Sequence, residues 1–317
     1  MKQVKGRNVL SETVDEAMSG KRLKDFLKER MNFSGRTMKR LAMERHLFVN
    51  RKSARVDQRL REGDRILVLL DREETQDMAR TPMDLAVVYE DASLLVVNKP
   101  PHLVVHPTHN HKEDTLTNGV LYYFEQRQDP SIVRLVSRLD MNTSGLVLIA
   151  KNQFMHASLN QRNAPKGEAP LKTYLGITKG PWQQREGLID APIAWPDPSD
   201  YRRAVAPGGA PSQTSFQVLD QNEAVSLVRF TLWTGRTHQI RVHCAHLGHP
   251  LVGDELYGGP LPLTPPRQLL HASELSLLHP MTGERLSLFA PLPKDMKNYL
   301  LAQDLFCPDT PQEGPEK

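Results

Sequence analysis

Apolar residues near the start of the chain repeat with the spacing of amphipathic helices. The first pattern begins near Arg22, and its apolar positions are Leu23, Phe26, Leu27 and Met31. Side chains three or four residues apart share one face of a helix. A second helical pattern at 36–45 follows a break, and the hydroxyl of Ser34 is suited to cap its first turn. The pattern therefore predicts two short helices joined by a tight connection.

The same region ends in short apolar runs that predict strands. Residues 47–49 and 65–70 are apolar over strand length and are bounded by polar turn residues. Two helices followed by strands predict a small α+β domain at residues 20–70, with residues 1–19 as a loosely held lead-in. Residues 71–84 are acidic and polar without periodicity, which is typical of a linker.

A longer series of apolar runs predicts a second, larger domain at residues 85–305. The strands expected in it are 85–89, 94–99, 146–150, 172–177, 214–219, 224–232, 269–272 and 275–280. Helical patterns occur at 115–123, at 152–161 and after Pro291. The polar, Pro-rich end at 306–317 is expected to be disordered.

Positive charge is concentrated in the small domain. Residues 21–61 hold 14 Lys and Arg against 4 acidic residues, so the rest of the chain keeps 27 of the 41 basic and 33 of the 37 acidic residues. A local field of this kind is typical of a protein that binds a polyanion, although a run of charge is often only a solvated face.

Composition excludes several classes of protein. A length of 317 residues suits about two domains, and 39% hydrophobic residues suit a globular core. Two distant cysteines, Cys244 and Cys307, form no disulfide framework and fit a reducing compartment. The first twelve residues lack the apolar segment of a secretory signal, and no run approaches the roughly 18 apolar residues of a membrane helix. We therefore expect a cytoplasmic protein with no membrane partner.

Asp140 is the leading candidate for a catalytic residue. It precedes the turn-forming stretch 142–145 and the apolar run 146–150, which predicts a buried strand. Functional side chains are often placed on such loops at the end of rigid elements. Taken alone, an aspartate in this position is as often only a turn residue.

The surrounding sequence favours catalysis. Residues 138–146 read Arg-Leu-Asp-Met-Asn-Thr-Ser-Gly-Leu, which resembles the catalytic motif of the RluA-type RNA pseudouridine synthases, roughly Arg-Leu-Asp-x-x-Thr-Ser-Gly-Leu. Many members carry His before this Arg, whereas this chain has Ser137, which leaves open how Arg138 is supported.

Further stretches carry the same resemblance over about residues 85–293. Lys172-Thr173-Tyr174 is similar to the strand that brings a tyrosine into the family's active site, and residues 235–243 read Gly-Arg-Thr-His-Gln-Ile-Arg-Val-His. Arg241 corresponds in this motif to the arginine that pairs with the catalytic aspartate. Residues 248–259 also match, and their glycines suggest tight turns.

The resemblance implies a fold and a reaction. It implies an α+β protein with a mixed, mostly antiparallel bent sheet flanked by helices and loops, preceded by an S-four-type RNA-binding domain. It also implies isomerisation of uridine to pseudouridine in RNA, with Asp140, Tyr174 and Arg241 as catalytic residues and without a cofactor or metal. Tyr174 would stack on the base and could help to remove its carbon-5 proton. Arg241 would keep Asp140 ionised in a closed pocket. The residues expected to contact RNA or the base are Arg138, Thr143, Arg236, His238, Leu270, Arg36, Lys39 and Arg40.

Several alternatives stay open from the sequence. The RNA is expected to be ribosomal, with transfer RNA as the other possibility, and the protein is expected to act as a monomer. A non-catalytic RNA-binding or ribosome-assembly protein could keep the same fold. Histidines at 102–111 and 238–249 suggest a third possibility, a metal-dependent hydrolase, but their spacing matches no standard metal motif. Residues 201–203, Tyr-Arg-Arg, could touch RNA, but the Pro- and Gly-rich surroundings favour an ordinary surface loop.

Overall fold

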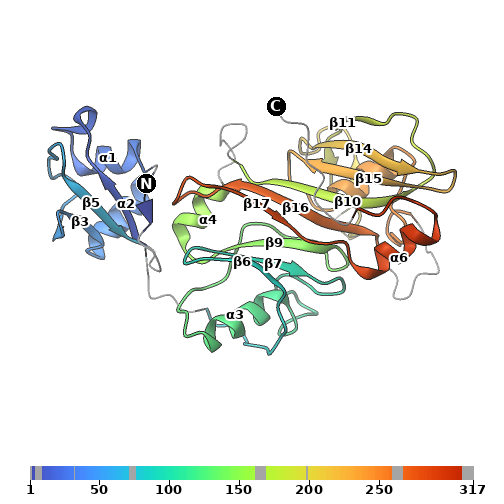
Figure 1. The fold of residues 1–317 in the computed structure, drawn as a ribbon, viewed down its shortest axis with the longest axis horizontal. Coiled ribbons are helices and arrows are strands. Elements are labelled where there is room, and N and C mark those ends of the chain that lie inside the picture. The colour runs from blue at the N-terminus through green and yellow to red at the C-terminus, as the bar shows by residue number, and fades with distance from the viewer. Residues whose placement is uncertain are drawn as a thin grey trace.

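The computed structural model describes residues 2–3, 9–31, 33–70, 76–160, 169–197, 199–258 and 267–308. It consists of a small N-terminal domain and a larger domain built on one long, curved sheet (Figure 1). Within these ranges no helix is both long and apolar enough to cross a membrane.

The N-terminal domain has two helices against a five-stranded antiparallel sheet in the order β1-β2-β5-β3-β4. The helices are α1 (Leu23–Glu29) and α2 (Gly35–Met43), and the strands are β1 (Lys2–Gln3), β2 (Val9–Thr13), β3 (Leu47–Val49), β4 (Lys52–Ser53) and β5 (Arg65–Leu69). A single 3-10 turn, Glu16–Met18, precedes α1. The expected N-cap is present, since the Ser34 side chain accepts a hydrogen bond from Thr37 N–H.

The predicted lead-in at residues 1–19 is wrong in one respect. Val9–Thr13 pairs along its whole length with β5, and Val9 and Leu10 are buried in the domain core. The sequence signal was weak because the strand is short and continues into the polar residues Ser11 and Glu12. The small domain therefore begins at least ten residues before the predicted boundary.

The larger domain is built on a mixed, mostly antiparallel sheet, as expected. Its main path runs β11-β14-β15-β10-β16-β9-β7-β6, while β17 pairs with β16 and β8 with β9. The strands are β6 (Val87–Glu90), β7 (Leu94–Lys99), β8 (Arg134–Leu135), β9 (Ser144–Ala150), β10 (Leu171–Lys179), β11 (Glu186–Asp190), β14 (Gln213–Gln221), β15 (Val225–Leu232), β16 (Leu270–Leu278) and β17 (Arg285–Phe289). A separate two-stranded ribbon joins β12 (Ile193–Ala194) to β13 (Ala204–Val205).

The middle of the long sheet holds a short parallel junction. Strands β9 and β16 pair in parallel through only two positions, Ser144 with His271 and Gly145 with Ala272. Every other pairing in the sheet is antiparallel among the residues that the structure describes. The loop that carries Asp140 enters β9 at this junction, so the two halves of the sheet meet beside the candidate catalytic residue.

The described part of the larger domain also contains the helices α3 (Leu116–Gln126), α4 (Gln153–Leu159), α5 (Gln239–His246) and α6 (Lys294–Ala302). Strand β7 alternates its apolar side chains between α3 and α4: Leu95 and Val97 share a core with α3, while Leu94 and Val96 share one with α4. This alternation follows from the two-residue period of a strand. Strand β9, which follows the Asp140 loop, is buried along its full length because it lies between the same two helices.

The two domains touch at α4. The ring of Phe33 lies edge-on to that of Phe154, with centroids 5.0 Å apart, and the Arg40 guanidinium donates a hydrogen bond to Gln153. Residues 71–75 of the predicted linker lie outside the described residues, and 76–84 contain no helix or strand.

The predicted disordered tail at 306–317 is wrong for its first residues. Phe306 N–H donates to Asp220, and Pro308 is buried. Residues 309–317 lie outside the described residues.

Candidate active site

The loop carrying Asp140 is fixed to β16 by a glycine. Gly145 has a φ of +112°, and a β-carbon there would lie 2.2 Å from the carbonyl oxygen of Ala272. Only glycine allows the two backbones to approach this closely. Asp140 itself begins the turn, since its carbonyl accepts a hydrogen bond from Thr143 N–H. The loop that carries Asp140 is thus held directly against the neighbouring strand.

Two buried cations also hold the loop through its carbonyl oxygens. Lys99 Nζ donates to Met141 O at 2.9 Å, and Arg267 Nη1 donates to Asn142 O at 3.2 Å. Both side chains are almost completely buried. Burial, together with the nearby charge of Arg267, lowers the pKa of Lys99 to about 7. Arg267 is neutralised by Asp295, so its charge is balanced where it touches the loop.

Ser137 stands where many members of the family carry His, and the structure shows how this residue is held. Its buried hydroxyl accepts a hydrogen bond from Leu148 N–H on β9, at 3.0 Å. This bond anchors the residue before Arg138 to the catalytic strand. Arg138 itself is exposed, which leaves its guanidinium available to a ligand.

Asp140 and Arg241 form the predicted ion pair. Arg241 Nη1 donates to Asp140 Oδ2 at 2.9 Å, although the two residues are 101 positions apart in sequence. The other side of the guanidinium makes two bonds to Asp254, Nε to Oδ2 at 2.7 Å and Nη2 to Oδ1 at 2.8 Å. A bidentate pair fixes the plane of a guanidinium as well as its position.

Asp254 is the residue that sequence reasoning missed at this site. Its side chain has no exposed surface, and its Oδ1 also accepts hydrogen bonds from Leu256 and Tyr257 N–H. Burial by itself lowers the pKa of Arg241, but the hydrogen bonds and charge of Asp254, with those of Asp140, raise it overall. Arg241 therefore stays charged under all ordinary conditions. An aspartate directly after a glycine, inside a stretch already matched to the family, was the available signal.

His238 and Tyr257 extend the network on the side of α5. His238 has a left-handed backbone conformation, with φ of +58°, and its Nε2 lies 3.9 Å from Asp140 Oδ2. Its Nδ1 is 3.0 Å from the Tyr257 hydroxyl. Burial lowers the pKa of His238, against the opposing charge of Asp140, so the neutral ring is favoured near pH 7. His238 was expected to contact RNA, which stays a prediction, and the structure places its ring beside the Asp140 carboxylate.

Tyr174 lies on β10, opposite Phe230 on β15 and Ala272 on β16. The residue is only 5% exposed, and burial together with the charge of Asp140 raises the pKa of its hydroxyl far above the usual range. The phenol therefore remains protonated, which makes it a poor general base. Tyr174 was predicted to stack on the base and to help remove its carbon-5 proton, and both roles stay predictions.

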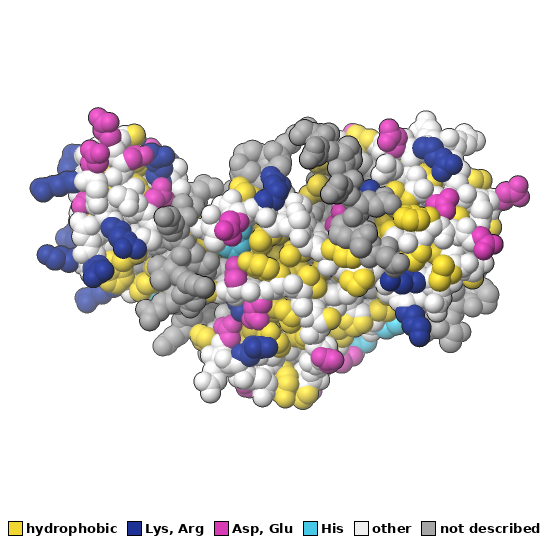
Figure 2. Space-filling view, in the orientation of Figure 1, with side chains coloured by type: hydrophobic (Ala, Val, Ile, Leu, Met, Phe, Trp, Pro, Cys, Tyr) yellow, Lys and Arg dark blue, Asp and Glu magenta, His cyan; other side chains and the backbone are white. Residues whose placement is uncertain are grey.

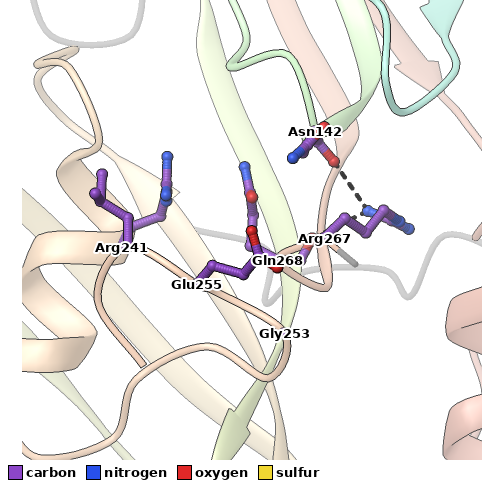
Figure 3. A pocket seen from close by; sticks show the side chains of 7 residues that line it. Asn142, Arg241, Gly253, Glu255, Arg267 and Gln268 are labelled. Atoms are coloured by element: carbon purple, nitrogen blue, oxygen red, sulfur yellow. Dashed lines mark hydrogen bonds between the residues drawn. The ribbon is translucent and has the colours of Figure 1, made fainter. Parts of the chain in front are cut away.

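A pocket of about 240 Å³ adjoins the ion pair (Figure 3). Figure 3 shows the side chains of Arg241 and Asn142 on opposite sides of it, with Gln268 between them. The volume is somewhat below the roughly 300 Å³ at which small-molecule sites usually begin, so the pocket suits a small ring rather than a large cofactor. The residues lining it are Asn142, Arg241, Gly253, Glu255, Leu256, Arg267 and Gln268. Asp140 and Tyr174 are not among them, so the pocket lies beside the catalytic carboxylate.

The predicted contacts to RNA or base in the larger domain have different outcomes. Thr143 was wrong as a direct RNA contact, because its side chain is buried and its hydroxyl accepts a hydrogen bond from Gln268. Arg236 is exposed, with Nε donating to Pro211 O at 3.3 Å. Leu270 is buried in the same core as Tyr174, where its contact with the base stays a prediction.

The residues predicted to contact RNA in the N-terminal domain also differ in their exposure and contacts. Arg36 and Lys39 are exposed on α2, and Lys and Arg side chains are spread over the side of this domain that faces away from the larger one (Figure 2). Arg40 instead contacts Gln153 and lies 3.7 Å from Glu44. Arg40 therefore contributes to the contact between the domains, and its contact with RNA stays a prediction.

The histidine clusters form no metal site within the described ranges. His243 is buried between the Thr214 hydroxyl and the Ala191 carbonyl, and His249 stacks on Trp182. These contacts account for both rings as structural residues. The metal-dependent hydrolase therefore has no support in this part of the chain.

Comparison with known proteins gives consistent matches. The model of the family described as RNA pseudouridylate synthase matches residues 93–246. An uncharacterized RNA pseudouridine synthase, YhcT, of Bacillus subtilis (strain 168) is 37% identical over 296 residues, covering 93% of this chain and 97% of the relative. Ribosomal large subunit pseudouridine synthase D of Yersinia pestis is 34% identical over 303 residues, covering 90% and 92%.

Solved structures agree on the fold. The human RNA Pseudouridylate Synthase Domain Containing 1 matches with a TM-score of 0.52 and 27% identity, covering 72% of this chain and 97% of that one. The human RNA Pseudouridylate Synthase Domain Containing 4 has a TM-score of 0.58 at 22% identity, covering 71% and 95%. The matched share of this chain leaves room for an additional domain, which is what the small N-terminal sheet provides.

Proposed function

This chain belongs to the RNA pseudouridine synthase family, whose members are isomerases, and we propose that it converts specific uridines of ribosomal RNA to pseudouridine with Asp140 as the catalytic residue. The observation that carries the assignment of Asp140 is its ion pair with Arg241, which is itself held by the buried Asp254. A carboxylate fixed in this way, partly open to solvent and beside a pocket, is suited to act on a bound nucleotide.

The ion pair is difficult to explain as a device for stability. Burying charges costs free energy that their mutual attraction often fails to recover. Two carboxylates around one guanidinium would also be unnecessary in a protein that only binds RNA, because phosphates attract cations and repel carboxylates. A chemical role for Asp140 explains why a carboxylate is kept at a surface that must accept a polyanion.

The reaction needs only groups that the chain and the substrate supply. The target nucleotide is extruded from its stack, at a cost of a few kcal/mol, so that its base and ribose reach the site. The bond between N1 and C1′ breaks, the uracil rotates, and a bond forms between C5 and C1′. Loss of the proton on C5 and gain of a proton at N1 balance the exchange without an oxidant, a cofactor or a metal.

Each residue of the site has a part in this proposal. Asp140 acts at the ribose, either as a nucleophile at C1′ or as a base at a neighbouring carbon. Arg241 holds the carboxylate ionised and oriented. Tyr174 packs against the base, and its high pKa keeps it a hydrogen-bond donor rather than a base. Leu270, in the same core, closes the pocket beneath the base.

Ribosomal RNA is the proposed substrate for two reasons. Relatives covering nine-tenths of this chain are named as ribosomal large subunit pseudouridine synthases. The N-terminal domain adds a basic surface, which we propose is an S-four-type RNA-binding module with Arg36 and Lys39 as phosphate contacts. We further propose that the enzyme works in the cytoplasm as a single chain.

Pseudouridine mapping across total cellular RNA tests the proposal. Three strains are compared: one with this gene, one without it, and one carrying only Asp140→Asn. We expect the same one or few ribosomal sites to disappear in both altered strains. Sites lost from transfer RNA would correct the substrate. If no site changes and the purified enzyme forms no pseudouridine in ribosomal transcripts, the chain is an RNA-binding protein without this activity.

A further inference from the structure

The loop between β12 and β13 presents large aromatic side chains to solvent. Tyr201 is 81% exposed and Trp195 is 50% exposed. Several large aromatic side chains exposed on one short loop are more informative than a single one, because grouped exposed apolar groups mark sites for ligands or partners. The loop also carries Arg202 and Arg203, so aromatic and cationic groups are interleaved.

Hydrogen bonds within the loop hold the Trp195 side chain and the loop backbone in place. Trp195 Nε1 donates to Asp200 O at 2.7 Å, and Asp200 Oδ1 accepts from Arg202 N–H at 3.0 Å. Asp197 similarly accepts from the backbone and hydroxyl of Ser199. Asp200 Oδ2 also lies 3.8 Å from Arg202 Nε, so the loop carries two arginines balanced by two carboxylates. Its outward chemistry is therefore aromatic and polar, with Arg202 and Arg203 as the cationic groups.

The loop is joined to the active site through two side chains. Arg203 N–H donates to the Tyr257 hydroxyl at 2.8 Å, and that hydroxyl is bonded to His238, which lies beside Asp140. Strand β13 also packs on α5, whose first turn follows His238. The loop is therefore connected to Asp140 through Tyr257 and His238.

Arg203 has unused binding capacity. Its guanidinium carbon lies 3.9 Å from the centre of the Trp195 ring, a cation–π arrangement that fixes the charged group. Within the described ranges, its buried Nη1 has no hydrogen-bond partner. A donor that is desolvated and unpaired is costly, and an incoming phosphate or base oxygen would satisfy it.

We propose that residues 195–197 and 199–203 form a second RNA-binding surface, which holds the unpaired nucleotides flanking the target uridine. Tyr201 stacks on a flanking base, while Arg202 and Arg203 contact the backbone or base edges. This inference rests on the proposed function, because extrusion of a uridine leaves neighbouring bases unstacked. Stacking on aromatic rings with nearby cations is the usual way that proteins bind single-stranded nucleic acid. It replaces the interpretation of residues 201–203 as an ordinary surface loop.

Binding of two RNA probes to the full-length protein tests the proposal. One probe is a fluorescein-labelled hairpin with an all-uridine loop, and the other is a blunt duplex with the sequence of its stem. Tyr201→Ala should weaken hairpin binding roughly 5- to 100-fold and leave duplex binding unchanged, since only unpaired bases can stack on the ring. Arg202→Ala should lower the slope of log affinity against log salt by about 0.7 for the hairpin.

Phe306→Ala is the matched control, because Phe306 is also exposed, at 46%, and its backbone is bonded to Asp220, outside the loop. It should bind both probes like wild type. Wild-type affinity for the hairpin in both Tyr201→Ala and Arg202→Ala would overturn the proposal, as would an equal loss for hairpin and duplex. Pseudouridine formation by the wild-type protein is measured separately in ribosomal transcripts. Its absence would refute the proposed function while the comparison of hairpin and duplex still decides the role of the loop.

Discussion

The N-terminal surface and the active site both carry arginine, but they use its charge in opposite ways. On α2, Arg36 and Lys39 are exposed and come from one short stretch of sequence. In the active site, Arg241 is buried and is shared between Asp140 and Asp254, which come from different parts of the chain. Exposed cations attract phosphates over a distance and are screened by salt, whereas a buried, paired cation fixes the geometry of one carboxylate.

Because the two regions use charge differently, we expect the N-terminal surface to govern RNA affinity and the active site to govern turnover. Changes on the N-terminal surface should alter how strongly RNA binds and how that binding depends on salt. Changes in the active site should alter turnover, stability or pH dependence, with little effect on overall affinity. Four variants test this separation.

The largest effect is expected from Asp140→Asn. Asparagine keeps the shape of the side chain but removes the charge and the basic oxygen, so turnover should fall to background. RNA affinity should stay at or above the wild-type value, because a negative charge is lost from a surface that binds RNA. Tritium release from labelled ribosomal transcripts and fluorescence anisotropy measure the two quantities. Asp84→Asn, an exposed aspartate in the segment before β6, serves as the control, and turnover near wild type in Asp140→Asn would reject the catalytic role.

Asp254→Asn should have the next largest effect. It leaves the buried Arg241 without its bidentate partner, and breaking a buried ion pair costs about 3–5 kcal/mol. Urea denaturation measures the free energy of unfolding. The matched control is Asp295→Asn, because Asp295 also pairs with a buried arginine, Arg267, but its own carboxylate is 48% exposed. An equal loss in the two variants would mean that burial of the carboxylate is not what makes the Asp254 pair important.

His271 should make stability depend on pH. Its buried ring lies between the Ser144 hydroxyl and the Ala290 carbonyl, and burial lowers its pKa to about 4. The unfolded chain binds a proton near pH 6.5, while the folded protein resists it down to about pH 4. Stability contributed by the neutral ring is therefore complete above pH 6.5 and is lost as pH falls toward 4, by at most about 1.4 kcal/mol per pH unit.

Denaturation of His271→Gln across this pH range isolates that contribution. The variant should lose less stability than wild type between pH 6.5 and 4, because glutamine does not titrate. The other buried histidines remain in both proteins and cancel in the difference. Parallel stability curves would show that His271 does not resist protonation in the folded state.

The smallest effect is expected from the N-terminal surface. Replacing Arg36 and Lys39 together by Gln should reduce the slope of log affinity against log salt by about 1.5, with no change in single-turnover rate at saturating RNA. Arg40 is left intact because it contacts α4. The control is the pair Arg285→Gln and Lys294→Gln, two exposed cations on the larger domain. The same change of slope in both double variants would deny the N-terminal surface any special role.

Local patterns predicted most of the elements and the general position of the site. The helical spacing of Leu23, Phe26 and Leu27 and the buried run of β9 were sufficient, because an amphipathic face or a fully apolar strand is written in adjacent residues. The strand Val9–Thr13 was missed because its partner, β5, lies more than fifty residues away and supplies the reason for it to be extended.

The sequence by itself determined which residues could carry the chemistry. Asp140, Tyr174 and Arg241 were identifiable as candidates because each stands in a stretch that resembles a motif of the family, and such motifs are written in adjacent residues. The concentration of positive charge in residues 21–61 could also be recognised from the sequence, since exposed charges attract a polyanion without needing a particular neighbour in the fold.

Only the tertiary structure decided how those residues are held. In the folded protein Arg241 pairs with Asp254, and His238 lies beside the Asp140 carboxylate. Thr143 is buried, and Arg40 contacts Gln153 where the two domains meet. The fold also connects the loop with Trp195 and Tyr201 to Asp140 through Tyr257 and His238. The physical reason is that burial, hydrogen-bond geometry and pKa depend on neighbours brought from distant parts of the chain, and those neighbours exist only once the two halves of the sheet meet at the β9–β16 junction.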